Sequence, residues 1–304
     1  MTSPASSPTP PSLTLYAAAG VELRTQAVQR ARKRLAGLGF DVSVDPSVKM
    51  RSQRFAGDDD ARLATLLRIA QAAPSIALAA RGGYGMTRLL DRLSWKRLAA
   101  SVERGTRWVG YSDITALQLG LLAHAGVSTW AGPMATGDFG GEDIDEVTRD
   151  CFAEAMSGEL EAVGFRTEAG FDGLQARGTL WGGNLAVLVS MLGTPHFPRI
   201  KGGILFAEDV NEHPYRVERH LLQLRQAGVL EAQKAVLLGS FTEWKPSPLD
   251  RGYTFKSAVS HLRAACKVPI LTGLPFGHVP TKVCLPVGRR VTLLVDGRDA
   301  LLGW

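Results

Sequence analysis

The chain has 304 residues, 45% of them hydrophobic and 21% charged, a composition typical of a globular protein with one large or two ordinary domains. Its net charge of +6 comes from basic residues spread along the chain among acids. We therefore expect no nucleic-acid partner, and we interpret the densest basic run, Arg32-Lys33-Arg34, as the solvated face of a helix. No apolar run reaches the roughly 18 residues that a membrane-spanning helix needs, so we expect no membrane partner either.

Two further features concern cellular location. The three cysteines, Cys151, Cys266 and Cys284, are odd in number and have no paired spacing, which predicts reduced thiols in a cytoplasmic protein. Segment 1–12 is rich in Ser, Pro and Thr and has neither the basic nor the apolar stretch of a signal peptide. We expect it to be a disordered tail.

From residue 13 to residue 156, strand patterns alternate with helix patterns. This alternation is typical of a doubly wound α/β domain with a parallel sheet, and we expect one domain over 13–156. Ligands of such sheets bind at the carboxyl ends of the strands. The expected strands are 13–16, 40–44, 76–80, 108–110 and 128–131, and the expected helices are 21–38, one opening at Asp58, one starting near Met86, 114–125 and 144–156.

Three consecutive acids, Asp58-Asp59-Asp60, open the second of these helices. Carboxylates are favoured at a helix N-terminus because they complement the helix dipole. We therefore predict a helix start here rather than a metal site, and we expect no metal in the protein.

Two turns that follow strands could carry chemistry. The loop Arg81-Gly82-Gly83-Tyr84-Gly85 places backbone amides where they can bind an anion, although a tight turn that simply needs glycine explains it equally well. The stretch 108–117 predicts a strand, a tight turn at Ser112 and a helix. It matches only half of the nucleophile elbow G-x-S-x-G, because Ile114 stands where the second glycine would be. The alternative is a helix start capped by Ser or Asp.

After residue 156 the periodicity is lost, and we expect a linker over 157–176, followed by a β-rich domain over 177–304 with fewer helices. In this second half Asn184 follows a strand and a glycine turn and is interpreted as a helix cap. The expected strands there are 178–181, 204–207, 235–238 and 269–272, with antiparallel strands at 283–285, 291–295 and 301–304.

Two side chains of the second half are candidates for catalysis. Glu208 and Asp209 end an apolar strand, where a carboxylate can orient an imidazole; the alternative is that they and Glu212 charge the start of the next helix. His278 lies in a Gly- and Pro-containing loop directly after a strand, whereas the other histidines lie in helix patterns or in turns beside proline.

Five segments, taken together and in this order, resemble the L,D-carboxypeptidases that act on muropeptides, a serine peptidase family that also contains microcin C self-immunity peptidases. The resemblance covers nearly all of the chain after the tail. The segments are Arg81–Gly85, Gly110-Tyr111-Ser112-Asp113, Gly182-Gly183-Asn184-Leu185 with Gly193-Thr194-Pro195, Glu208-Asp209-Val210-Asn211-Glu212, and Gly273-Leu274-Pro275-Phe276-Gly277-His278.

The resemblance implies a catalytic triad of Ser112 as nucleophile, Glu208 as orienting carboxylate and His278 as base. The oxyanion donors would be the backbone amides of Asp113 and Gly83. The implied fold is a flavodoxin-like N-terminal domain and a β-rich C-terminal domain, with the site between them. The implied enzyme is a cytoplasmic homodimer without a cofactor. It would release terminal D-alanine from murein tetrapeptides, small peptide substrates of peptidoglycan recycling.

Two alternatives stay open at this point. The first is a peptidase of the same family that cleaves a peptidyl nucleotide such as microcin C, which would need an aromatic surface for the nucleotide. The second is a flavodoxin-like binding module without catalysis. The chain also departs from the family after its first strand, where Ala17-Ala18-Ala19-Gly20 replaces a turn that contains Pro or Ser, so substrate preference is left open.

Overall fold

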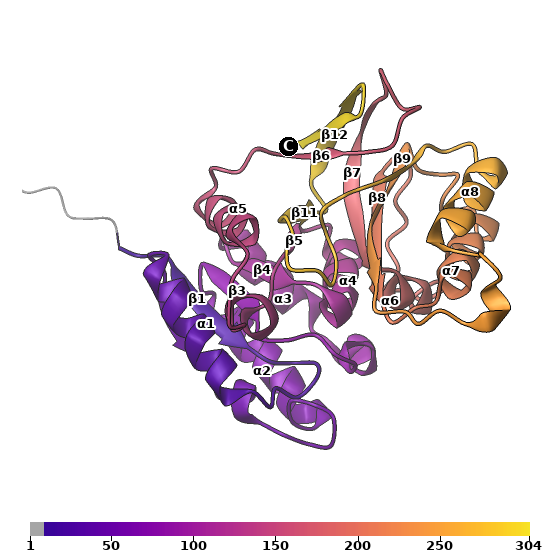
Figure 1. Ribbon diagram of the computed structural model, residues 1–304. Helices are drawn as coiled ribbons and strands as arrows, with labels where there is room; N and C mark the ends of the chain where they lie inside the picture. The colour runs from indigo at the N-terminus through magenta and orange to yellow at the C-terminus, as the bar shows by residue number, and fades with distance from the viewer. Residues whose placement is uncertain (1–8) are drawn as a thin grey trace, which may run out of the picture.

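The computed structural model describes residues 9–304, and the predicted tail, residues 1–12, falls mostly outside them. Two sheets form the fold (Figure 1). The strands are β1 (Ser12–Tyr16), β2 (Asp41–Val44), β3 (Ile76–Ala79), β4 (Arg107–Gly110), β5 (Thr129–Ala131), β6 (Ala162–Arg166), β7 (Gln175–Asn184), β8 (Ile204–Val210), β9 (Ala235–Thr242), β10 (Ile270–Thr272), β11 (Leu285–Val287), β12 (Arg290–Asp296) and β13 (Asp299–Gly303). The first sheet contains β1 to β5 together with β11, and the second contains β6 to β10, β12 and β13.

The first sheet has the order β11-β5-β4-β3-β1-β2, with β1 to β5 parallel, which confirms the predicted doubly wound sheet. The chain moves outward from β1 to β2 and then crosses back to β3 and onward to β5. Since such crossovers are right-handed, the first helix and the next three cover opposite faces of the sheet. The helices of the molecule are α1 (Thr25–Gly37), α2 (Asp59–Ala72), α3 (Trp95–Glu103), α4 (Thr115–Ala125), α5 (Glu146–Ser157), α6 (Leu185–Ser190), α7 (Pro214–Gln226) and α8 (Phe255–Ala265).

The reversal of strand order lies between β1 and β3. At such a switch point the loops from neighbouring strands diverge and leave a crevice at the carboxyl ends of the strands. The loop after β1 contains Gly20, the loop after β3 contains Gly82, and Ser112 follows the next strand, β4. The topology thus brings three short loops to one edge of the sheet.

The second sheet has the order β10-β9-β8-β7-β12-β13-β6. Strands β7 to β10 are parallel, and β7, β12, β13 and β6 are antiparallel. The predicted antiparallel ending is confirmed for β12 and β13. Helices α4 and α6 pack against each other, and α4 also contacts β7, so the helix that follows Ser112 lies against the second half of the chain (Figure 1).

Two segments depart from the predicted domain boundaries. The expected linker 157–176 contains β6, which pairs with β13 at the edge of the second sheet. Its alternating burial, with Val163 and Phe165 inside, is too short a pattern to stand out among the glycines and acids around it. Strand β11 comes from the C-terminal half yet pairs antiparallel with β5 and so completes the first sheet.

Local chemistry explains several of these elements. The side chain of Asp58 accepts a hydrogen bond from the amide of Ala61, so it caps α2 as predicted for the acidic run. Asp59 pairs with Arg62 and Arg88, and Asp60 pairs with Arg92. Among residues 9–304, no helix is both long enough and apolar enough to cross a membrane.

We predict that Leu285→Ala lowers the free energy of unfolding by about 2–5 kcal/mol, because Leu285 is fully buried in the strand that ties the C-terminal half to the first sheet. The matched control is Leu301→Ala in β13, where the side chain is 47% exposed and the expected change is within about 0.5 kcal/mol. Urea unfolding of both variants measures the difference. Equal losses would contradict a structural role for β11.

Candidate functional site

Ser112 lies on a strained turn between β4 and α4. It has φ of +62°, a left-handed conformation that is uncommon outside glycine, and a 3-10 turn over Ser112–Ile114 follows it. Gly110 precedes the turn, and a Cβ at Gly110 would lie 3.1 Å from side-chain atoms of Ala79 and Ile114. The turn therefore raises Ser112 above the edge of the sheet while its neighbours Tyr111 and Asp113 stay buried.

The glycine loop after β3 lies directly on this turn. A Cβ at Gly82 would meet Ser112 Cβ at 2.8 Å, Ser112 Oγ at 2.9 Å and the backbone nitrogen of Asp113 at 3.3 Å, so only glycine fits. The amide of Gly20, after β1, donates to the carbonyl of Gly82 at 2.9 Å. Gly83 follows with φ of +83°. The three loops at the switch point thus meet around the hydroxyl of Ser112.

Asp113 joins the two loops through its side chain. Its Oδ2 accepts a hydrogen bond of 2.7 Å from the amide of Met86, the residue that follows the glycine loop. Burial raises the pKa of Asp113 to about 6, while hydrogen bonds from the backbone of Met86 and the charge of Arg62 act in the opposite direction. The sequence prediction assigned only the backbone amide of Asp113 and missed this carboxylate.

Glu208 and His278 are in hydrogen-bond contact. His278 Nδ1 lies 2.7 Å from Glu208 Oε2, and Glu208 has no exposed surface. The edge of the Tyr111 ring packs against the imidazole, with 4.9 Å between ring centroids, and Thr242 donates to the carbonyl of His278. Because Nδ1 faces the carboxylate, Nε2 is the nitrogen of His278 that stays available to another partner.

The backbone around Glu208 is irregular in a way that favours this contact. The register between β8 and β9 shifts between Ala207 and Asp209, so β9 carries one extra residue there. Such bulges bend a strand and redirect its side chains. On the other side, a Cβ at Gly277 would lie 3.2 Å from Glu208 Cβ and Oε2, and Gly277 has φ of +137°. The His278 loop can approach Glu208 this closely only with glycine at that position.

Asn184 and Asp209 complete the surroundings of Glu208. Asn184 Nδ2 donates to Glu208 Oε1 at 3.3 Å and to Asp209 Oδ1 at 2.8 Å. Asn184 Oδ1 accepts a hydrogen bond from the backbone amide of Val187, which confirms the predicted helix cap. The backbone amide of Asn184 donates to Thr115 Oγ1 in α4. Only the helix cap at Asn184 could be predicted from the sequence, because no spacing pattern links this residue to the carboxylate of Glu208, 24 positions away.

Ser112 and His278 line the same pocket, with a volume of about 370 Å³. Its wall carries two arginines, Arg24 and Arg81, and one acid, Glu243. Glu243 and Asn211 both have φ of +60° and lie at the ends of the paired strands β9 and β8. The lining residues are Arg24, Arg81, Gly82, Gly83, Ser112, Met134, Thr136, Gly137, Val210, Asn211, Glu243 and His278.

The other sequence candidates lie away from this pocket. Glu212 pairs with Arg216 on α7, which agrees with the helix-start interpretation. His196 bridges His124 and Asp91, and His213 contacts Asp250. Within residues 9–304, no group of three or more His, Cys, Asp or Glu is arranged to hold a metal ion.

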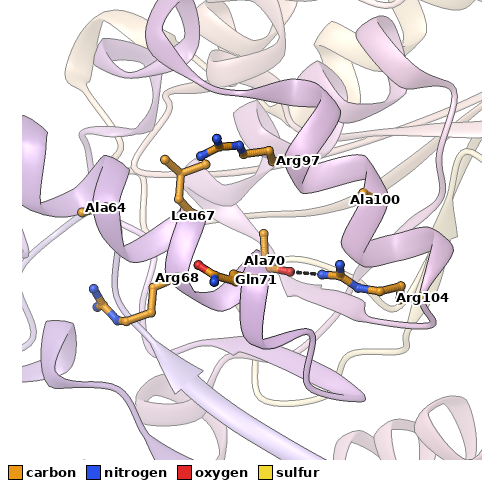
Figure 2. Close-up of a pocket in the computed structure, with 8 residues that line it drawn as sticks. All are labelled: Ala64, Leu67, Arg68, Ala70, Gln71, Arg97, Ala100 and Arg104. Carbon is orange, nitrogen blue, oxygen red and sulfur yellow. Dashed lines mark hydrogen bonds between the residues drawn. The ribbon is translucent and has the colours of Figure 1, made fainter.

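A second hollow, of about 530 Å³, lies between α2 and α3 (Figure 2). Its floor is formed mainly by small side chains, and arginines surround it, one of which, Arg104, donates to the carbonyl of Ala70. Arg68 is engaged with Asp45. The residues that line this hollow include neither a serine or threonine nor a histidine, whereas the pocket at Ser112 has both a serine and a histidine in its wall.

Comparisons with known proteins identify the family. The model of the LD-carboxypeptidase N-terminal domain matches residues 14–132, and that of the LD-carboxypeptidase C-terminal domain matches residues 177–293. A putative carboxypeptidase of Streptomyces coelicolor is 35% identical over 273 residues, which cover 86% of this chain and 84% of the relative.

Solved structures show the same similarity. The muramoyltetrapeptide carboxypeptidase from Oxalobacter formigenes is 40% identical, has a TM-score of 0.88, and matches over 96% of this chain and 97% of its own. The microcin C7 self immunity protein MccF, in its wild-type apo state, has a TM-score of 0.85 with coverage of 97% and 96%; at 19% identity it shows the shared fold alone. The chain therefore belongs to the LD-carboxypeptidase family and is a serine-type carboxypeptidase.

Proposed function

We propose that this enzyme hydrolyses the amide bond between the L-centre of meso-diaminopimelate and the terminal D-alanine of murein tetrapeptides. The observation that carries the proposal is the buried Glu208–His278 contact of 2.7 Å in the same pocket as the strained Ser112. The 40% identical structure is that of a muramoyltetrapeptide carboxypeptidase, which supports the substrate class.

In the proposed mechanism, Ser112 Oγ attacks the scissile carbonyl carbon and His278 Nε2 takes the hydroxyl proton. Glu208 accepts a hydrogen bond from Nδ1–H, holds the imidazole in this tautomer and stabilises the imidazolium without taking the proton. The tetrahedral intermediate then collapses, His278 protonates the leaving nitrogen, and D-alanine departs. Water attacks the acyl-enzyme by the same route and releases the tripeptide and free Ser112.

The oxyanion donors in this proposal are the backbone amides of Asp113 and Gly83. The amide nitrogen of Asp113 lies beside Gly82 and at the start of a helix, where backbone N–H groups are free to bind an anion. The Met86–Asp113 bond keeps the glycine loop and the serine turn in register. Each lost donor of this kind costs roughly 2.7–4 kcal/mol of barrier.

No hydrogen bond joins Ser112 to His278 within residues 9–304. Resting active sites often have a long nucleophile–base distance that shortens when substrate binds. The ring of Tyr111 packs against the imidazole, and the hydroxyl of Thr242 donates to the backbone carbonyl of His278, so contacts hold both the ring and the backbone of this residue. We propose that Ser112 Oγ and His278 Nε2 come within hydrogen-bond distance in the substrate complex.

The pocket favours a peptide over a peptidyl nucleotide. Among its twelve lining residues there is no Phe, Tyr or Trp that a nucleobase could stack on. Two arginines against one acid leave its wall net positive, which suits a substrate that carries several carboxylates. A binding module without catalysis would have no need for a buried carboxylate aimed at the histidine in this pocket.

We also propose a cytoplasmic homodimer that acts in peptidoglycan recycling. Cys151 and Cys284 are free, and Cys151 Sγ accepts a hydrogen bond from the amide of Cys284. Two neighbouring thiols that stay reduced fit a reducing compartment. The dimer follows from the resemblance to the family.

Ser112→Ala should lower kcat by roughly 10⁴- to 10⁶-fold, because the nucleophile is lost while the fold is kept. Release of D-alanine from murein tetrapeptide measures the activity, and the thermal unfolding midpoint verifies the fold. Turnover near the wild-type rate would defeat the assignment of Ser112.

Glu208→Ala should lower kcat by about 10⁴-fold, since the imidazole loses the group that orients it and stabilises its charge. The matched control is Glu212→Ala, which removes only the pairing with Arg216 at the start of α7 and should change kcat by no more than a few-fold. Steady-state kinetics of both variants decides between the two acids. A larger effect at Glu212 would move the triad.

Asp209→Asn should make stability less dependent on pH. Burial raises the pKa of Asp209 to about 6 in the fold from an ordinary 3.8, so between these values the folded chain holds a proton that the unfolded chain has released. This group therefore stabilises the fold most at low pH, and the contribution is lost as pH rises toward 6. In the variant, the free energy of unfolding should fall less steeply as pH rises, by up to about 1.4 kcal/mol per pH unit. An unchanged slope in urea unfolding from pH 4 to 6 would contradict it.

A further inference from the structure

Arg81 is a cation without an acidic partner beside the serine turn. It follows β3, is partly buried, and lines the pocket with Ser112 and His278. Its Nη1 donates to the carbonyl of Val21 at 2.8 Å, and no hydrogen bond or salt bridge connects it to a carboxylate within residues 9–304. Its charge is thus held in place by one neutral contact, and the rest of the guanidinium is free to bind an anion.

Arg24, the other arginine of the pocket, differs in this respect. Its Nε lies 3.1 Å from Oε1 of Glu22, whose side chain is buried, and a second nitrogen donates to Thr136. Glu22 therefore balances the charge of Arg24. The positive charge that stays unmatched in the wall of this pocket belongs to Arg81.

Arg81 also lies at the correct end of the pocket for a terminal carboxylate. Its Nε is 3.7 Å from the place where a Cβ of Gly83 would be, so the guanidinium lies beside the amide proposed as an oxyanion donor. In a carboxypeptidase substrate, three bonds of about 1.3–1.5 Å separate the attacked carbon from the carbon of the terminal carboxylate. The carbon of the terminal carboxylate therefore stays within roughly 4 Å of the attacked carbon, in the pocket whose wall carries Arg81.

We infer that Arg81 binds the terminal carboxylate of the substrate and thereby restricts cleavage to the last residue of the peptide. The inference deepens the proposed function and rests on it, because it takes Ser112 as nucleophile and Gly83 as oxyanion donor. A free carboxylate gains charge-assisted hydrogen bonds from the guanidinium, whereas an internal or amidated residue leaves the partly buried cation unpaired. Arg81 is thus a specificity-determining residue, distinct from the groups that move protons.

Two substrates test this role: the murein tetrapeptide and the same peptide with its C-terminal D-alanine amidated. We expect wild-type enzyme to prefer the free acid by roughly 10- to 100-fold in kcat/KM. In Arg81→Gln this ratio should fall close to one, mainly through loss of activity on the acid. Chromatography with mass detection of D-alanine and D-alaninamide measures both rates.

Two further variants separate this role from a structural one. Arg81→Lys keeps the charge and should retain part of the preference for the acid. Arg24→Gln is the matched control and should change kcat/KM for both substrates by a similar factor, so that their ratio is kept. Thermal unfolding of each variant verifies that the fold is intact.

The outcomes are distinct. If Arg81→Gln lowers both rates equally, or if the ratio falls in Arg24→Gln instead, the inference about Arg81 is wrong while the proposed function stands. If a folded wild-type enzyme releases neither D-alanine nor D-alaninamide, the proposed function fails and the role of Arg81 falls with it.

Discussion

The carboxylate of Glu208 is fully buried, so the rest of the site must supply the polar contacts that water would otherwise provide. An ionised group without access to water is tolerated only when other groups replace its hydration. In this protein, His278 and Asn184 contact its two oxygens. The glycine at 277 lets the loop of His278 approach Glu208. Loss of any of these features would leave a buried charge unpaired, so the geometry at His278 follows from the need to satisfy Glu208.

The second constraint is the lack of space around Ser112. In the common nucleophile elbow, a second glycine two positions after the serine provides room at the turn. Here Ile114 occupies that position, and the room comes from the loop after β3. Because Gly82 has no side chain, the space within 3 Å of Ser112 Oγ stays open. Gly20 supports Gly82 from the far side. The protein thus solves the same steric problem with a glycine that is remote in sequence.

Helix α4 connects these two constraints. Its first residue, Thr115, follows the serine turn, and its hydroxyl accepts a hydrogen bond from the amide of Asn184, whose side chain contacts Glu208. Ser112 follows a strand of the first sheet and Glu208 lies in a strand of the second, and this contact connects their surroundings. Strand β11 adds a second link, because it belongs to the C-terminal half and pairs with β5 of the first sheet. The two halves of the chain therefore form the pocket together.

Much of this could be predicted from the sequence, because it depends on local patterns. The alternation of strands and helices predicted the parallel sheet, acids and Asn184 marked helix starts, and Ser112, Glu208 and His278 became candidates because each lies at or after the end of a strand. The carboxylate of Asp113, the bond from Asn184 to Glu208 and the unmatched charge of Arg81 could not be predicted. Each depends on which side chain from a distant segment lies within about 3 Å, and hydrophobic periodicity carries no information on such contacts. The amino-acid sequence by itself determined which residues end strands and where helices begin, since these follow from local backbone chemistry; only the tertiary structure decided which of those ends meet, because burial and long-range packing select the partners.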